Sequence, residues 1–194
     1  MKFVCGVGEL GFPALFAGAR RRIILHAAVY GPFAESEPHR SGLEEALARS
    51  SFGRLDVLAL LPGGNEPWRI PFLEVLRSGI PRQDVEAEIV RSAEFLMDLS
   101  RRYPGKVRVH FTSVLPCFPV VIVDDEICFG QYSHASVPAP GGFWGRVSAD
   151  VERLLGWAEE GRIPAQAQAE AAAAYRLVSE CVVAMKSGIP PKDI

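Results

Sequence analysis

The chain has 194 residues, the size of one ordinary domain. Hydrophobic residues make up 48% and charged residues 23%, a composition that excludes intrinsic disorder. The formal net charge of −2 excludes a strongly basic protein that coats nucleic acid, although it allows a local basic patch. Nucleic acid is therefore not indicated as a partner by charge.

Neither a membrane span nor a metal site is expected from the sequence. No apolar run reaches the ~18–20 residues that a transmembrane helix needs. The four cysteines are widely separated and lack the C-x-x-C spacing of zinc and redox sites: Cys5, Cys117, Cys128 and Cys181. Reduced thiols in a cytoplasmic protein are the expectation.

Strand and helix patterns alternate along the first third of the chain. Pro13 fits the first turn of a helix, where its missing N–H does no harm, and Ser41 with Glu44 resembles a capping box. In chain order we predict a strand over residues 2–5, a helix from Gly11 to Arg22, a buried strand from Ile23 to Val29, a helix from Ser41 to Ser50 and a buried strand from Leu55 to Leu61.

The rest of the chain adds a hairpin and more helices, so we predict an α/β fold with a mixed sheet flanked by helices. Asp124-Asp125 resembles a tight turn between two apolar strands. We predict helices over residues 70–78 and from Gln83 to Tyr103, a half-exposed strand from Lys106 to Ser113, hairpin strands from Pro119 to Val123 and Ile127 to Tyr132, and helices from Phe143 to Glu160 and Ala165 to Ser187.

The last predicted helix carries an apolar stripe that must be covered. Leu177, Cys181 and Met185 follow one another at steps of four, on the same face. The covering is either the chain's own body or a second subunit. We favour the second subunit, with residues 1–162 forming the domain and residues 163–194 a helical extension.

Three motifs have both a chemical and a structural interpretation. Gly6-Val7-Gly8-Glu9-Leu10-Gly11 matches the G-x-G-x-x-G turn that binds a dinucleotide, but the interpretation we favour is a glycine-rich connection that turns the chain. Cys117 is either a nucleophile with His110 or His134 as its base, or an inert packed thiol. Asp124-Asp125 is either a carboxylate pair or turn chemistry, which we favour.

The segment from Ser113 to Gly130 resembles the signature of the phospholipase D superfamily. That signature is H-x-K-x-x-x-x-D, an apolar hairpin strand and then Gly-Ser. Asp124 falls on its Asp and Gly130 within one residue of its Gly, whereas Cys117 falls on the His and Pro119 on the Lys. The resemblance covers roughly residues 10–160 and is greatest to the catalytically degenerate phospholipase D-like domains of bacterial regulators.

The resemblance implies that the chain keeps a fold and a cleft but not phosphodiesterase chemistry. In active members the His forms a covalent phosphohistidine and the Lys holds the phosphate oxygens, and neither Cys117 nor Pro119 can do the same. The expected protein is a pseudoenzyme with no cofactor and no metal, and a homodimer. By analogy with the fold, its ligand is a phosphate-bearing small molecule or a nucleic-acid backbone.

The ligand is expected at the carboxyl ends of the strands. The candidate lining residues are Tyr30, Thr112, Ser113, Cys117, Gln131, Tyr132, Ser133 and His134. Two rival functions remain open: an enzyme that depends on a dinucleotide or a thiol, and a structural interaction protein whose last helix is its contact surface. An accessible Cys117 beside a histidine would favour the enzyme, and a sealed one the binding module.

Overall fold

A computed structural model describes residues 1–132, 137 and 139–191 of the chain. Strands and helices alternate along it, with short 3-10 turns at two connections. In chain order the elements are β1 (Lys2–Cys5), η1 (Val7–Leu10), α1 (Phe12–Gly18), β2 (Arg22–His26), α2 (Gly31–Glu35), α3 (Glu37–Ala48), β3 (Arg54–Leu60), α4 (Arg69–Leu76), α5 (Arg82–Arg102), β4 (Val107–Thr112), β5 (Val120–Val123), β6 (Glu126–Gly130), η2 (Ala139–Gly141), β7 (Phe143–Ser148), α6 (Val151–Glu160) and α7 (Ala169–Ser187).

All seven strands belong to one mixed sheet in the order β1-β7-β6-β5-β2-β3-β4. Strands β2, β3 and β4 are parallel, as expected for strands joined through helices. Strand β5 pairs antiparallel with β2, and the antiparallel β5-β6-β7 meander continues the sheet to the edge strand β1. The predicted fold class, an α/β fold with a mixed sheet flanked by helices, is confirmed.

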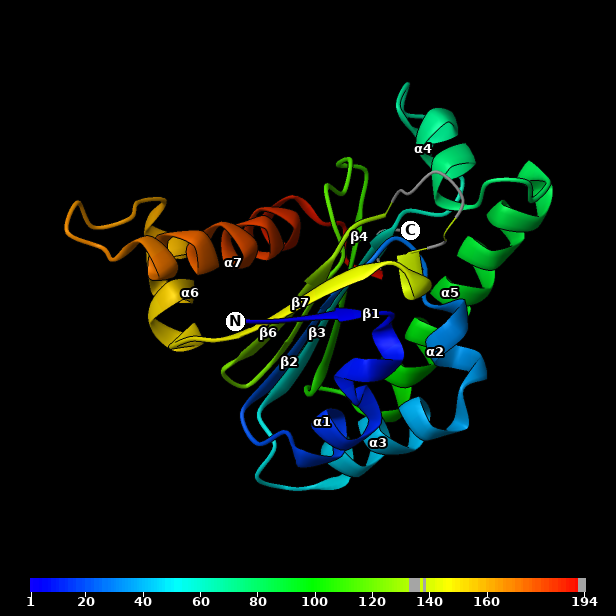
Figure 1. The fold of residues 1–194 in the computed structure, drawn as a ribbon. Coiled ribbons are helices and arrows are strands. Elements are labelled where there is room, and N and C mark those ends of the chain that lie inside the picture. The colour runs from blue at the N-terminus through cyan, green and yellow to red at the C-terminus, as the bar shows by residue number, and fades with distance from the viewer. Residues whose placement is uncertain (133–136, 138, 192–194) are drawn as a thin grey trace.

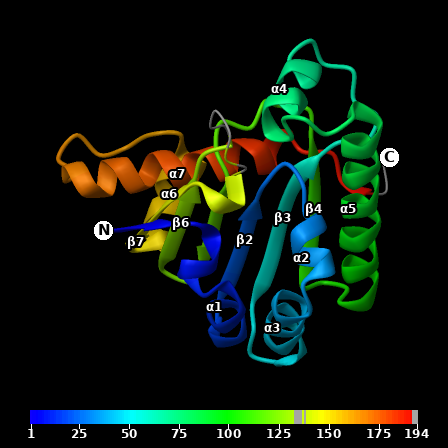
Figure 2. The same cartoon turned by 45° about the vertical axis from the view of Figure 1, so that its right-hand side comes forward.

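Helices cover both faces of the sheet (Figures 1 and 2). Helices α1, α2, α3 and α5 lie on one face, and α6 and α7 lie on the other. Because successive strand residues point to opposite faces, Leu25 of β2 packs in the first core and Ile24 in the second. Strand β5 is buried on both faces along its whole length, as its unbroken apolar sequence predicts.

The prediction of a single helix from Phe143 to Glu160 is wrong. Residues Phe143–Ser148 form β7 instead, and α6 begins only after Asp150. Tertiary pairing explains the difference, because β7 lies between β6 and β1 and places Trp144 in the core. The Asp150 carboxylate accepts a hydrogen bond from the Arg153 N–H at 3.1 Å and so caps α6.

Several other boundaries differ from the prediction by a few residues. Helix α1 ends at Gly18 and not at Arg22, since Ala19 is extended and β2 already begins at Arg22. Helix α3 begins four residues before Ser41, with Pro38 in its first turn. The short helix α2 was not predicted, because its Gly-Pro start reads as a turn.

The apolar stripe of α7 is covered by the chain's own body, so the second subunit that we favoured is not what covers it. Val178 and Cys181 are fully buried, and they share a core with Ile24 of β2 and Leu58 of β3. Helix α6 packs beside α7 on the same face (Figure 1). Helix α7 thus completes one of the two layers over the sheet.

Candidate functional site

A cavity of about 110 Å³ lies at the carboxyl end of β2, where the sequence predicts the ligand cleft. Two predicted site residues, Tyr30 and Tyr132, line it together with Pro119, which occupies the Lys position of the resemblance. The rest of the lining is mostly apolar: Val7, Leu25, Ala27, Ala28, Val29, Phe33, Leu76, Val121, Pro140 and Trp144. Polar lining groups beyond the tyrosines are His26, His39 and Arg77.

The cations of this cavity are not available to a phosphate. The Arg77 guanidinium donates to both carboxylate oxygens of Glu88, at 2.9 and 2.7 Å. His26 is 2% exposed, and burial lowers the pKa of its imidazole to about 4, so the ring is neutral at pH 7. Burial also lowers the pKa of His39. The cavity therefore suits an uncharged group better than an anion.

Tyr30 is a structural anchor at the base of the cavity. Its hydroxyl lies 2.9 Å from the Leu25 carbonyl oxygen and 2.7 Å from that of Leu58, and it accepts a hydrogen bond from the Ala27 N–H at 2.9 Å. The Tyr30 N–H donates to the Ser92 hydroxyl at 2.9 Å. These bonds tie the turn after β2 to β3 and α5, so the Tyr30 hydroxyl has little capacity left for a ligand.

Cys117 lies in the loop between β4 and β5 and is exposed. Its N–H faces the Glu180 carboxylate of α7 at 3.5 Å. Partial burial raises the pKa of the Cys117 thiol, and the nearby Glu180 carboxylate raises it further. A catalytic thiol needs the opposite environment, a cation or helix N-terminus that stabilises the thiolate.

The histidine proposed as a base for Cys117 lies elsewhere. His110 Nε2 faces the Asp56 carboxylate at 3.4 Å, and His110 lines a groove at the opposite ends of the strands. His134, like Ser133, lies outside the described residues. The accessible thiol that would favour an enzyme is thus present, but its charged neighbour among the described residues is the Glu180 carboxylate.

The other predicted lining residues are only partly brought together. Thr112 is buried at the end of β4, where its hydroxyl accepts a hydrogen bond from the Val114 N–H at 3.0 Å. Ser113 and Gln131 are exposed. None of these three lines the cavity that holds Tyr30 and Tyr132.

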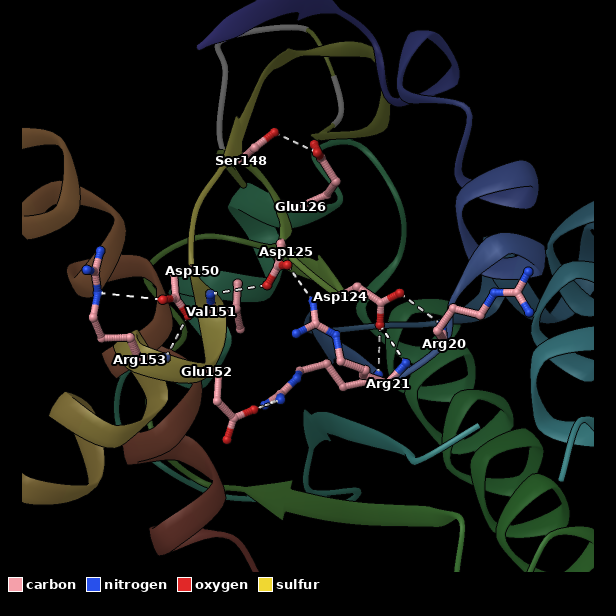
Figure 3. A network of polar contacts seen from close by, with 11 residues as sticks. Arg20, Arg21, Asp124, Asp125, Glu126, Ser148, Asp150, Val151, Glu152 and Arg153 are labelled. Carbon is pink, nitrogen blue, oxygen red and sulfur yellow. Dashed lines mark hydrogen bonds and ion pairs between the residues drawn. The ribbon is translucent and has the colours of Figure 1, made fainter. Parts of the chain in front are cut away.

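Asp124, the acidic residue that the resemblance retains, is a structural group (Figure 3). Its carboxylate accepts hydrogen bonds from the backbone N–H groups of Arg20, Arg21 and Arg22 at 2.8, 2.7 and 3.0 Å. Burial alone would raise the pKa of Asp124, but these hydrogen bonds outweigh burial and lower it. Asp124 has a φ of 51°, as the first residue of the predicted tight turn requires.

Asp125 joins the same hairpin to α6 (Figure 3). Its carboxylate forms an ion pair with the Arg21 guanidinium and faces the Val151 N–H at 3.4 Å. The Asp-Asp pair is therefore turn and capping chemistry, the alternative that we favoured. Within residues 1–132, 137 and 139–191, no group of three metal-binding side chains comes together.

The glycine-rich motif at residues 6–11 does not have the setting of a dinucleotide site. Such a site needs a strand, a turn and a helix that lead into a neighbouring parallel strand. Strand β1 is instead the edge strand of the sheet, antiparallel to β7 and separated from β2 by three strands. The structure therefore does not give this motif the setting that the dinucleotide alternative requires. None of the helices in the described part of the chain is long and apolar enough to cross a membrane.

Comparisons with known proteins give only distant structural matches. No protein-family model and no curated protein matches the chain. TrmBL2, an archaeal chromatin protein, is 14% identical with a TM-score of 0.44, covering 82% of this chain and 49% of its own. NucT from Helicobacter pylori is 10% identical with a TM-score of 0.45 and covers 97% of both chains.

A third similar structure is the phosphatidylserine synthase of Haemophilus influenzae Rd KW20. It is 10% identical with a TM-score of 0.46, covering 95% of this chain and 43% of its own. This chain thus spans about half the length of TrmBL2 and of the synthase. NucT and the synthase have phospholipase D-like folds. At TM-scores below 0.5 these similarities carry no conclusion about activity or partners.

His26 and Glu180, which the structure places in this region, are not among the site residues predicted from the sequence. His26 lies in an apolar strand. Glu180 lies on the final helix, 63 positions after Cys117 in the sequence. Only the packing of α7 over the sheet brings Glu180 to Cys117. A lone carboxylate on a helix gives no sequence signal for such a contact.

Proposed function

We propose that this protein is a non-catalytic ligand-binding module with a phospholipase D-like fold. The observation that carries the proposal is the state of Cys117 and Pro119. The thiol has a raised pKa beside Glu180, and Pro119 lines an apolar cavity without charge or donor. Among the described residues at this end of the sheet, a phosphoryl group would meet neither an activated thiol nor an unpaired cation that could hold it.

The cavity at the end of β2 is the proposed binding place for an uncharged group. Its apolar lining and neutral His26 support this choice over the phosphate that the resemblance implies. A homodimer remains part of the proposal. The exposed rings of Phe3 and Phe143, tilted against each other with centroids 5.1 Å apart at the sheet edge, offer an apolar surface for it.

Native mass spectrometry of the purified full chain tests the proposal. We expect a non-covalent adduct that collisional activation removes, and no covalent adduct after incubation with bis-p-nitrophenyl phosphate. A covalent phosphoryl adduct would overturn the non-catalytic assignment. A chain that carries no adduct in any preparation would speak against binding, and the same spectra report whether the chain is a dimer.

A further inference from the structure

A groove of about 740 Å³ lies at the opposite, amino-terminal ends of the parallel strands. Its floor is formed by side chains of β2, β3 and β4 on the face that α6 and α7 cover. Its wall is formed by residues of those two helices. The groove is far larger than the cavity at the carboxyl end of β2, and its volume lies within the range of small-molecule sites.

Basic side chains outnumber acidic ones in this groove. Five arginine and lysine residues and three acidic residues line it. The basic residues are Arg21, Arg22, Arg54, Arg108 and Lys186, and the acidic residues are Asp56, Glu152 and Glu159. This excess is local, since the whole chain has a formal net charge of −2.

The sheet register places arginines next to one another. Arg22 of β2 lies directly opposite Arg54 of β3, and Arg108 of β4 lies opposite Asp56. Neighbouring strands are about 4.8 Å apart, so the like charges of Arg22 and Arg54 repel each other. Burial lowers the pKa of Arg22, and the nearby Arg21 and Arg54 lower it further.

The close approach of these strands depends on Gly53. A Cβ atom at this position would lie 2.2 Å from the Arg21 carbonyl oxygen, which already accepts a hydrogen bond from the Arg54 N–H at 3.2 Å. A backbone atom cannot move aside as a side chain can. Gly53 therefore holds the Arg21-Arg22 segment against the start of β3.

Two cations of the groove have no charged partner among the described residues. Arg108 is exposed and forms no ion pair with any described residue, and Lys186 donates only to the Glu159 carbonyl oxygen, at 3.2 Å. The Arg22 Nε is buried without a hydrogen-bond partner in the described part of the chain. Arg22 and Arg54 are ion-paired with Glu152 and Asp56, so the cations left to neutralise are Arg108 and Lys186. Two unpaired cations beside an unused Arg22 Nε point to an anionic ligand.

The acidic residue on the floor is already compensated. The buried Asp56 carboxylate accepts a hydrogen bond from the Arg54 Nε at 2.7 Å and faces His110 Nε2 at 3.4 Å. Burial raises the pKa of Asp56, but these two partners outweigh burial and lower it. Asp56 thus fixes Arg54 and His110 in the floor and does not repel an anion above them.

We propose that this groove binds a small phosphomonoester whose phosphate contacts Arg54, Arg108 and Lys186. Arg108 and Lys186, which have no ion pair among the described residues, match the two charges of a phosphate dianion, and arginine suits phosphate oxygens because it donates two parallel hydrogen bonds. The non-phosphate part packs on Ile24 of the floor and on the apolar side chains of the wall: Leu155, Val182 and Met185. The site is separate from the cavity of the proposed function and can fail or succeed independently.

Isothermal titration calorimetry with 1-naphthyl phosphate tests the assignment. We expect binding of 1-naphthyl phosphate to the full chain, weaker binding of inorganic phosphate and none of 1-naphthol. Arg108→Gln should weaken binding by about tenfold or more, and Arg108→Lys should retain part of it. Because Arg108 forms no ion pair within the described residues, its substitution should leave the melting temperature unchanged.

Arg91→Gln is the matched control, since Arg91 is an exposed arginine of α5 outside the groove. It should bind 1-naphthyl phosphate as the unaltered chain does. Equal affinity in Arg108→Gln, or no binding to the unaltered chain at millimolar ligand, would overturn the proposal. So would a single-stranded oligonucleotide that binds while 1-naphthyl phosphate does not, because the groove would then hold a nucleic-acid backbone.

Discussion

The side chain at the predicted nucleophile position is a thiol whose surroundings favour its protonated form. Cys117 is exposed enough to react, and its pKa is raised by partial burial and by the Glu180 carboxylate. The exposure of the Cys117 thiol thus favours reaction, whereas its raised pKa opposes reaction. Acidity decides the matter, because the thiolate and not the thiol is the nucleophile.

We predict that Cys117 alkylates slowly near neutral pH. In a Cys5→Ser background, which removes the other exposed thiol, the iodoacetamide rate should reach half of its maximum above the usual thiol pKa. Glu180→Gln should shift this midpoint to lower pH, and Cys117→Ser should abolish the reaction. A midpoint near pH 7 in the unaltered site would identify an activated thiol and contradict the account.

Burial of His26 makes stability depend on pH. Its pKa is about 4 in the folded chain and 6.5 when exposed, so the unfolded state binds more protons and acid favours unfolding. The unfolding free energy is therefore not reduced by His26 above pH 6.5, and it decreases as the pH falls from 6.5 toward 4. Between pH 7.5 and 5 this linkage amounts to about 2 kcal/mol of unfolding free energy.

We therefore predict that His26→Leu flattens the pH dependence of unfolding. Urea titrations at pH 7.5, 6 and 5 should show the unaltered chain losing about 2 kcal/mol more than the variant. His39→Gln is the control, because the pKa of His39 is also lowered but its side chain is less buried. Parallel curves for the unaltered chain and His26→Leu would show that His26 is not held neutral.

At the scale of elements, α7 determines how the second face of the sheet is covered. Val178 of α7 is fully buried, whereas Val183 of the same helix is 56% exposed. Substitutions of these two valines therefore distinguish packing of α7 on the chain's own sheet from packing of α7 on a second subunit. The division of the chain into residues 1–162 and an extension remains a prediction that this pair also tests.

We predict that Val178→Asp unfolds the protein and Val183→Asp does not. An unpaired buried carboxylate costs several kcal/mol, comparable with a domain stability of roughly 5–15 kcal/mol. Thermal denaturation should show no cooperative transition for Val178→Asp and a nearly unchanged one for Val183→Asp. If Val178→Asp melts normally while Val183→Asp dissociates a dimer, α7 is an interface helix and the layered core is incorrectly described.

For the molecule as a whole, local patterns predicted most elements and tertiary contacts decided the rest. The apolar run at Pro119–Val123 and the Asp-Asp turn predicted β5 and its hairpin, because burial on both faces and turn chemistry are written locally. The sequence predicts a helix where β7 lies. The pairing of β7 with β6 and β1 depends on contacts between segments that local sequence patterns do not reveal. Local sequence patterns indicate periodicity and helix caps, but they do not indicate which strands pair with each other in the sheet.

The candidate site was predictable to a similar degree. The turn position of Asp124 followed from the sequence, and its role in holding three backbone N–H groups required the fold. The cationic groove could not be found in advance, since Arg22, Arg54 and Arg108 come from three segments. Only the parallel register of β2, β3 and β4 brings them together.

The proposed function, a ligand-binding module without phosphodiesterase chemistry, is tested most directly by hydrolysis of bis-p-nitrophenyl phosphate. The release of p-nitrophenolate is followed for the purified chain, with Cys117→Ser as the matched variant. The account predicts a rate equal to the protein-free blank for both. Turnover that survives purification to homogeneity and is lost in Cys117→Ser would contradict it.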